Sequence, residues 1–598
     1  MPASLPKRDE VKIEDTWKLE DIFSNDEVFQ EQLNKVKGLM GAFAAYEGKL
    51  TSSSTLLFEF LIQQDEISKL SGMLYVYAHM RLHQNGGNAF YQDLASKTET
   101  LMAEISAILS FANSELSALT SKNVLELLTQ TPALQLYERY LHEILRQKEH
   151  ILDSKTENLL ARVSEIANTA QNVYSMFNNV DLKFPIIKDG KGESIRLTHG
   201  TYIKYLENKE VTVRKSVFTA MYETYSSYRN TLATTFAANI KQYGVFSSVR
   251  KFDSPLHYAL SENNIPVSVY NNLIETVNKH MDIMHEYVAL RRDKLGLKEL
   301  HMYDLFVPLA KDFDKKISYA EATETILKAL EPLGADYVSV IKEAFNNRWV
   351  DKYENEGKRS GAYSWGTYGT PHPYVLMNYI DNVSNMFTLA HEMGHALHSY
   401  LSEKSQPFVY SGYSIFVAEV ASTVNEALLM QYLLKTVTDP EYKHYLINYF
   451  MEQFRSTLYR QTMFAEFEKD VHLANQNGET LTSELLCNKY YNLVKKYHGD
   501  DLTVDQLVEN EWARIPHFYT PFYVYQYATG YSAAIALSNR ILTGGQPAVT
   551  DYLKFLSSGS SKDPIDLLKI AGVDMSSPAP IEAALDTFRN LIKEMKAL

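Results

Sequence analysis

Apolar residues recur at intervals of three and four along most of the chain, the spacing that places an apolar stripe on one side of an α-helix. Short polar segments such as Asn85–Asn88 separate these stretches. No repeat of fixed period is present, which argues against a solenoid. The pattern predicts a mainly helical fold, with clear examples at 56–61, 101–116, 159–170 and 201–349.

Strand signals are few. Asp181–Ile187 and Glu193–Leu197 flank a glycine-containing turn, a pattern typical of a β-hairpin. We place a domain boundary after it, between an N-terminal helical domain at 1–200 and a second domain at 201–598. Val375–Tyr379 is predicted to be extended. Gly361–Tyr374 is rich in glycine, proline and aromatic residues, and fits either a packed aromatic loop or edge strands that bind an extended peptide.

The pentad His391-Glu392-Met393-Gly394-His395 falls within Met386–Leu401, where the apolar spacing is helical. On a helix, the two histidines lie within about 40° of each other and about 6 Å apart along the axis, so both imidazoles can hold one metal ion. Glu392 lies about 100° away, where its carboxylate reaches water at the metal without ligating the metal. A zinc hydrolase needs this arrangement, because zinc lowers the pKa of water and a base removes the proton. A chance pair of hydrogen-bonded surface histidines is the alternative.

Catalytic zinc takes a third protein ligand and keeps one position open. His398 is about 10 Å along the helix from His391, too far to share the ion. Leu401 stands where the extended metzincin motif has its last histidine, so that motif is absent. Glu419 is the best remaining candidate.

Glu419 belongs to a second predicted helix at 414–434. One stripe of this helix is apolar, and a separate stripe carries Glu419, Ser422, Thr423 and Glu426. An acidic group among so many apolar residues needs a partner or a metal, although a solvated helix face gives a similar pattern. Together with the pentad, Glu419 completes a two-histidine, one-glutamate site.

The stretches Phe387–Ser399 and Phe416–Ser422 resemble the thimet oligopeptidase family of zinc peptidases, most closely its bacterial oligoendopeptidase F branch. The similarity covers roughly residues 200 to 590. Further matching stretches occur in order along the chain, at 263–266, 303–309, 373–378 and 517–527.

The resemblance implies one Zn²⁺ ion held by His391, His395 and Glu419, with Glu392 as the general base. It also implies that a histidine and tyrosines of the 516–530 stretch face the metal and stabilise the oxyanion. They match His517, Tyr523 and Tyr527, with a spacing one residue different from the thimet-type enzymes, whereas Tyr519 and Tyr525 are expected to pack. We expect Glu426 and His398 to orient the ligands.

For the whole chain, the resemblance implies two helical lobes around a deep substrate channel, a small β-sheet beside the zinc helix, and a catalytic domain at 201–598. Such a channel would admit short unfolded peptides and exclude folded proteins. The resulting prediction is a zinc oligoendopeptidase. A zinc exopeptidase and a non-enzymatic helical zinc-binding protein are the alternatives, and manganese or cobalt would also fit the ligands.

Composition and charge bear on the expected partners and cellular location of the protein. The formal charge of −14 disfavours nucleic acid and anionic membranes as partners. The N-terminus lacks the apolar core of a secretory signal, and no run of about 18 uncharged apolar residues is present. The single cysteine, Cys487, excludes disulfides and fits a cytoplasmic protein, and it is expected to pack rather than react. The sequence does not address side-chain preference, substrate length, the physiological peptide or the oligomeric state.

Overall fold

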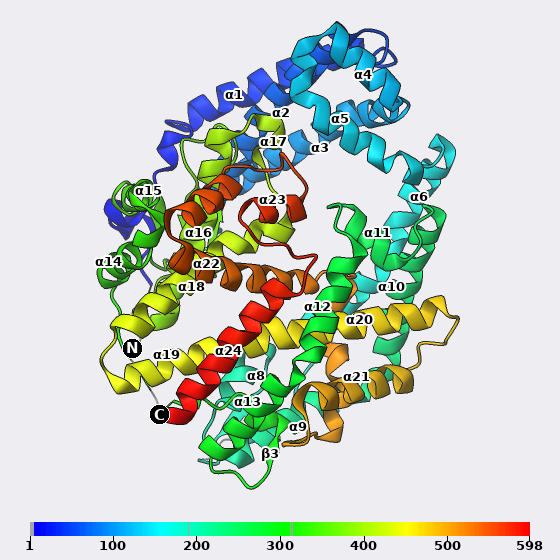
Figure 1. Ribbon diagram of the computed structural model, residues 1–598. Helices are drawn as coiled ribbons and strands as arrows, with labels where there is room; N and C mark the ends of the chain where they lie inside the picture. The colour runs from blue at the N-terminus through cyan, green and yellow to red at the C-terminus, as the bar shows by residue number, and fades with distance from the viewer. Residues whose placement is uncertain (1–4, 189–190, 311–312, 314) are drawn as a thin grey trace. The chain divides into compact units, whose positions relative to one another are not determined.

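Helices dominate the computed structural model, which describes residues 5–188, 191–310, 313 and 315–598 (Figure 1). They hold 72% of the residues, and strands hold 3%. The predicted mainly α class is therefore confirmed.

The chain folds into two units, each assembled from three segments. Unit 1 comprises Met1–Glu149, Asp314–Leu429 and Leu537–Gly572, and unit 2 comprises His150–Phe313, Met430–Ala536 and Val573–Leu598. Two of the crossings between units fall inside helices, α18 (Ile415–Thr436) and α22 (Tyr525–Leu556), and the crossing in α22 precedes the kink of that helix at Gly545. The units thus do not follow the contiguous division at residue 200, which stays a prediction about sequence domains.

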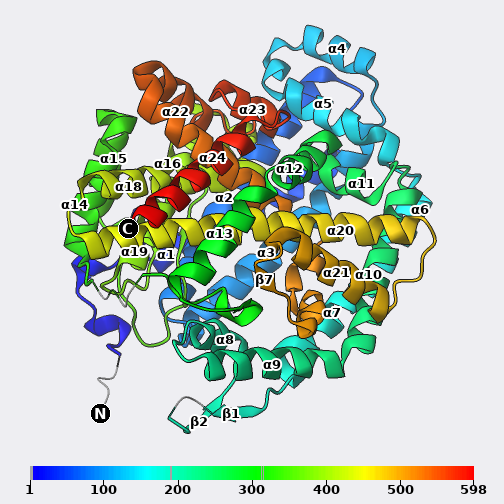
Figure 2. The same ribbon diagram turned by 60° about the horizontal axis from the view of Figure 1, so that its bottom comes forward.

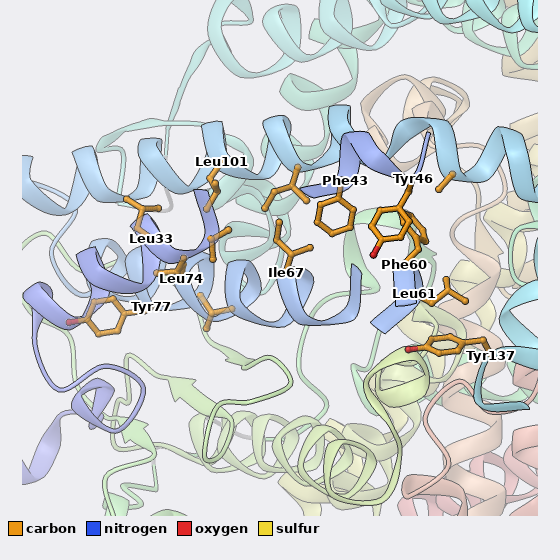
Figure 3. Close-up of a cluster of buried hydrophobic side chains, with 14 of the residues drawn as sticks. Leu33, Phe43, Tyr46, Phe60, Leu61, Ile67, Leu74, Tyr77, Leu101 and Tyr137 are labelled. Carbon is orange, nitrogen blue, oxygen red and sulfur yellow. The ribbon is translucent and has the colours of Figure 1, made fainter. Parts of the chain in front are cut away.

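The N-terminal helices of unit 1 enclose a core of their own. Side chains that begin these helices cap them: Ser53 accepts from the Leu56 N–H and Asn88 from the Phe90 N–H. Aromatic and branched residues, including Phe43, Phe60 and Leu101, fill the space between the helices (Figure 3). The helices are α1 (Asp26–Met40), α2 (Ser54–Gln84), α3 (Ala89–Ser117), α4 (Ser121–Gln130) and α5 (Glu138–Arg146).

A three-stranded sheet lies beside α16 (Val383–Ser405), as expected from the family resemblance. Its strands are β4 (Val350–Asp351), β5 (Tyr363–Trp365) and β6 (Tyr374–Leu376), in the order β4-β6-β5. β6 pairs parallel to β4 and antiparallel to β5, so β5 is an edge strand. The predicted extended run at 375–379 begins in β6 and continues as irregular backbone. The helices α14 (Tyr319–Ala329) and α15 (Ala335–Asn346) also contact α16.

The N-terminal segment, which precedes the first α-helix, stabilises this sheet through side-chain contacts. Arg8 donates to the carboxylate of Asp351, at 2.9 Å from Nη1, and Lys358 donates to the same carboxylate at 2.6 Å. Trp17, 2% exposed, donates its indole N–H to Gln84. Because Asp351 is itself only 1% exposed, the two cations compensate a charge that would otherwise be buried alone.

The remaining elements of unit 1 are α17 (Phe408–Ser411), α23 (Pro564–Ile570) and parts of α18 and α22. Unit 2 contains α6 (Ser154–Ala167), α7 (Thr169–Met176), α8 (His199–Leu206), α9 (Val211–Ser227), α10 (Arg229–Val249), α11 (Pro255–Ser261), α12 (Val267–Lys279), α13 (Met281–Lys294), α19 (Pro440–Gln453), α20 (Arg460–Gln476), α21 (Ser483–His498) and α24 (Ala579–Ala597).

Unit 2 also contains the predicted hairpin, next to α9 (Figure 2). β1 (Ile186–Lys188) pairs antiparallel with β2 (Ser194–Arg196), and Ile187 lies opposite Ile195. The hairpin prediction is confirmed, while turn residues 189–190 lie outside the described residues. A second, parallel pair joins β3 (Leu300–His301) to β7 (Leu502–Thr503).

No helix in the described part of the chain is both long and apolar enough to cross a membrane.

Candidate metal centre and active site

The pentad lies in the middle of α16. Asn382 begins this helix by accepting the Asn385 N–H at 2.8 Å. One helical turn separates the two histidines, and their Nε2 atoms lie 3.1 Å apart. The helix therefore brings both imidazoles to one point, as predicted.

Glu419 reaches the same point from α18. Its Oε2 lies 3.3 Å from the Nε2 of His391 and 3.5 Å from the Nε2 of His395. Three side chains predicted as ligands, from two helices, thus bring one ligand atom each to a common site.

The spacing of these atoms matches tetrahedral zinc. Zinc binds imidazole nitrogen and carboxylate oxygen at about 2.0–2.2 Å, so two ligand atoms of a tetrahedron lie about 3.3–3.6 Å apart. The measured separations of 3.1, 3.3 and 3.5 Å form a nearly equilateral triangle of this size. Two nitrogens and one oxygen are a catalytic type of donor set, with a fourth position left for water or substrate.

A glycine allows the two helices to approach closely enough. A Cβ on Gly394 would lie 2.5 Å from Cα of Ser422 and 2.7 Å from the carbonyl oxygen of Ala421. Any side chain at position 394 would therefore collide with the α18 backbone. In addition, Asn425 of α18 donates its amide to the carbonyl of Ala390 at 3.2 Å, which fixes the pairing of the two helices.

Glu426 orients the first histidine. Its Oε1 lies 2.5 Å from the Nδ1 of His391, so Nδ1 carries the proton and Nε2 is free to bind a metal. Burial opposes a charge on His391, but the hydrogen bonds to Glu419 and Glu426 raise its pKa to about 10. The pKa of Glu419 lies well below its usual range, because the two histidines outweigh the effect of burial. The two carboxylates favour a positive charge at this point, which a bound divalent cation would supply.

Glu392 lies beside the triad and is 7% exposed. Burial raises the pKa of its carboxyl group, and the neighbouring His391 and His395 partly oppose this rise. The backbone N–H of Ser364 in β5 donates to the carboxylate. A shielded carboxylate with a raised pKa is suited to accept a proton near neutral pH.

Among the described residues, no hydrogen bond joins His398 to a predicted metal ligand, so the structure gives no support to the orienting role that the sequence suggested. His398 is 1% exposed, and its ring stacks on Tyr413 with centroids 3.7 Å apart. Its Nδ1 has no hydrogen-bond partner among the described residues. Burial and the nearby His395 lower its pKa to about 3, so His398 is a neutral packing residue. Tyr413, which also bonds Ser399, was not anticipated, because it lies in an irregular segment between two helices.

The C-terminal candidates form a cluster in unit 2. Ring centroids of His517, Tyr523 and Tyr527 lie 6.1, 5.9 and 5.5 Å apart in pairs. His517 is exposed and the two tyrosines are half-buried, whereas Tyr519 and Tyr525 are buried as expected. The cluster therefore presents one imidazole and two phenols together at a surface of this unit.

A buried carboxyl group that was not anticipated from the sequence supports this cluster. Phe522 has a φ of 59°, in the left-handed region that non-glycine residues rarely adopt. Its N–H donates to Oε1 of Glu468 at 2.9 Å, while Oε2 has no partner among the described residues. Burial raises the pKa of Glu468 to about 8. The neutral acid thus holds the backbone immediately before Tyr523.

Cys487 is 3% exposed and its sulfur lies 3.5 Å from the indole nitrogen of Trp512. Burial raises the pKa of the thiol. It is a packing residue, as expected.

Comparison with known families decides the identity of the chain. Residues 204–587 match the model of peptidase family M3, and residues 115–184 match that of the N-terminal region of oligopeptidase F. The chain belongs to peptidase family M3. The predicted resemblance to the thimet and oligoendopeptidase F enzymes is thereby confirmed, and the non-enzymatic alternative is wrong.

Relatives of this M3 peptidase match along nearly its whole length. It is 49% identical over 594 residues to oligopeptidase PepF of Bacillus subtilis, covering 99% of this chain and 88% of that protein. It is 39% identical to the group B oligopeptidase PepB of Streptococcus agalactiae, covering 97% and 96%. The crystal structure of oligoendopeptidase F from Enterococcus faecium is 33% identical, with a TM-score of 0.73 and coverage of 96% and 99%. The predicted enzyme class, a metallopeptidase acting as an oligopeptidase, agrees with these matches.

Proposed function

We propose that this M3 peptidase is a zinc-dependent oligoendopeptidase that cleaves internal bonds of short peptides. The observation that carries the proposal is the triangle formed by His391, His395 and Glu419, which has the size of one face of a zinc tetrahedron. Glu392 lies next to this triangle, close enough for His391, His395 and Glu419 to act on its carboxyl group. A metal alone would not require such a buried carboxylate beside its ligands.

A zinc ion held by these three side chains would polarise the peptide carbonyl and bring the pKa of water towards neutrality. Glu392 accepts a proton from the attacking water and passes it to the leaving amine. The Ser364 N–H keeps the carboxylate oriented, and burial keeps its proton affinity high enough for both transfers. Glu426 holds the proton on Nδ1 of His391 throughout the cycle.

His517, Tyr523 and Tyr527 are proposed to donate hydrogen bonds to the oxyanion of the tetrahedral intermediate. Support comes from the family resemblance and from their gathering in one exposed cluster. Each such donor is typically worth about a hundredfold or more in rate.

Strand β5 is proposed to bind the substrate backbone. It is the edge of its sheet, and its Ser364 already donates to the catalytic carboxylate. Main-chain pairing along this edge would give affinity without strict dependence on sequence. The substrate channel, the cytoplasmic location and the catalytic domain at 201–598 are parts of the same proposal.

The test is digestion of a mixed peptide library, read by mass spectrometry. Zinc-loaded native protein is expected to cut internal bonds, and Glu392→Gln is expected to keep its zinc and lose activity by at least about a thousandfold. Equal turnover by the two proteins would refute the role of Glu392.

A second library, blocked at both termini, separates the two peptidase types. An endopeptidase cuts blocked peptides, whereas an exopeptidase leaves them intact. Cleavage restricted to unblocked peptides would therefore replace the proposal with the exopeptidase alternative.

A further inference from the structure

A cavity of about 320 Å³ lies between the second half of α16 and the loop that joins β5 to β6. Its wall on the helix side consists of Tyr400, Glu403 and Lys404, and its wall on the loop side is the segment 368–372. All of these residues belong to unit 1. The cavity is separate from the metal triad and has no part in the mechanism above.

The walls of this cavity are held in place by contacts outside it. Lys69 of α2 lies 5.2 Å from the ring centroids of both Tyr368 and Phe408. Gly369 has a φ of 101°, and a Cβ there would meet the sulfur of Met73 at 2.9 Å. A pocket whose loop is fixed before a ligand arrives loses little entropy on binding.

Two aromatic residues of the cavity wall, His372 and Tyr400, are held in place by contacts with Trp349. Trp349 stacks on His372, with centroids 4.3 Å apart and planes 3° apart, and its ring also lies 5.7 Å from that of Tyr400. The cavity is therefore lined by ring faces and edges, which favour a cation or an apolar stem.

Glu403 is the acidic group in this cavity. Among the described residues its carboxylate forms no hydrogen bond and no ion pair, and its charge acts only on the nearby hydroxyl of Tyr413. The adjacent Lys404 places its ammonium over the ring of Tyr400, 5.5 Å from the centroid, and forms no ion pair with Glu403. Burial raises the pKa of Glu403 to about 7, as expected of a shielded carboxylate without a cation beside it.

Position on α16 relates this cavity to the catalytic carboxylate. Glu403 follows Glu392 by eleven residues, which is about 16 Å along the axis and within about 20° on the same side of the helix. At Glu392, this side of the helix contacts β5 through the backbone of Ser364. At Glu403, it faces segment 368–372 of the loop that follows β5. A peptide extended along the β5 edge, at about 3.3 Å per residue, would cover this distance in about five residues.

We propose that this cavity is a subsite for a positively charged group of the peptide substrate, with Glu403 as its counter-ion, about four to six residues from the bond that is cut. The charged group is the ammonium or guanidinium of a lysine or arginine side chain, or the amino terminus of a peptide. The inference rests on the proposed peptidase function and adds a side-chain preference to it.

The experiment uses ten-residue peptides with one arginine moved stepwise away from the cut bond, each paired with a peptide carrying neutral citrulline instead. In the zinc-loaded native protein, kcat/KM is expected to favour arginine about tenfold at one or two positions in the stated range. Glu403→Gln is expected to reduce this ratio to about one. Glu104→Gln, which changes an exposed carboxylate on α3, is the matched control and is expected to keep the native ratio.

Binding is measured separately with the Glu392→Gln protein, where fluorescence anisotropy gives the Kd of the same peptides without turnover. The arginine preference is expected to appear in Kd and to vanish in the Glu392→Gln, Glu403→Gln double variant. Acetylated and free-amino forms of the same peptides distinguish the two sources of charge. A subsite for the amino terminus would bind the free-amino form more tightly whatever the side chain, whereas a side-chain subsite would favour arginine in both forms.

The outcomes separate the two proposals. If the native protein cuts the peptides with a preference neither for arginine at any position nor for a free amino terminus, or if the preference survives in Glu403→Gln, the subsite is refuted while the peptidase function stands. If none of the peptides is cut or bound, both are refuted.

Discussion

At the scale of single residues, the candidate metal centre depends on a carboxylate beside the ligands as well as on the ligands themselves. The two histidines and Glu419 supply the ligand atoms, while Glu426 decides which nitrogen of His391 is available. A ligand histidine without such a partner loses its preferred tautomer and orientation. The partner carboxylate is therefore as much a part of the site as the ligands.

Glu426→Gln is expected to weaken zinc binding about 10- to 100-fold, because an amide holds the Nδ1 proton of His391 less strongly than a carboxylate does. Competition with a chromogenic chelator measures the affinity. Glu441→Gln, an exposed change on α19, is the control and is expected to retain native affinity. Native affinity in Glu426→Gln would contradict the orienting role.

The pentad and Glu419 could be found from sequence, because helical spacing alone places His391 beside His395 and a polar stripe marks the second helix. His398 could not be judged in that way. The helical spacing predicts the side of the helix on which His398 lies. It does not predict that the ring stacks on Tyr413, because Tyr413 belongs to an irregular segment. Glu468 was missed for a related reason, since its partner is a backbone N–H held in a strained conformation.

At the scale of elements, the site depends on the close contact between α16 and α18 as much as on the ligand side chains. Position 394 has room for hydrogen only, because the α18 backbone lies directly against it. The distance between Glu419 and the two histidines follows from this contact. Changes in helix packing should therefore affect metal binding without altering any ligand.

Gly394→Ala is expected to lower the free energy of unfolding by about 2 kcal/mol or more and to weaken zinc binding, because the new methyl group forces the helices apart. Gly38→Ala is the matched control. It lies within α1 with open space around its Cβ position, and it should stabilise the protein by about 0.5–1 kcal/mol. Urea unfolding and a zinc titration measure both effects. Retention of native stability and affinity in Gly394→Ala would show that the helices can separate without cost.

Glu468 predicts a pH-dependent stability for α20 and the segment it supports. Its folded pKa of about 8 is above the unfolded value of 4.5, so its favourable contribution is complete below the unfolded value and is lost as the pH rises towards 8. Glu468→Gln does not titrate. The difference in unfolding free energy, variant minus native, should therefore shift in favour of the variant by about 3 kcal/mol between pH 6 and pH 9.

Urea unfolding at the two pH values measures this shift. The baseline destabilisation of the variant does not matter, because only the trend is compared. Glu441→Gln serves again as the control, with a difference that should not change with pH. A constant difference for Glu468→Gln would mean that its carboxyl group is already ionised in the folded protein.

At the scale of the whole molecule, each of the two units is built from segments that are far apart in the sequence. Helical spacing predicted the helices well, and two strand-like segments around a glycine-containing turn predicted the hairpin at 186–196, because each of these elements depends on local pattern. It did not predict that residues 1–149 share a unit with 314–429 and 537–572. Contacts such as that between Arg8 and Asp351 join residues 343 positions apart, and no local pattern records them.

The fragment 201–598 contains the whole match to the M3 family model but lacks the N-terminal support of its sheet. Without Arg8 and Trp17, the buried Asp351 loses one of its two cations and the sheet loses its cover. We expect this fragment to be unfolded or aggregated and to bind no zinc at the native affinity. Circular dichroism and the chelator assay test this, and a folded, zinc-binding fragment would show that the region is autonomous.

The burial of Cys487 against Trp512 has a practical consequence. A thiol that is shielded and reluctant to ionise reacts slowly with maleimides, and the chain has no second one. Cysteines introduced at exposed lysines, for example Lys12 and Lys593, would then be labelled selectively without first removing a native residue. Pairs of fluorophores attached in this way would report directly on movements of the chain while a peptide is bound and released.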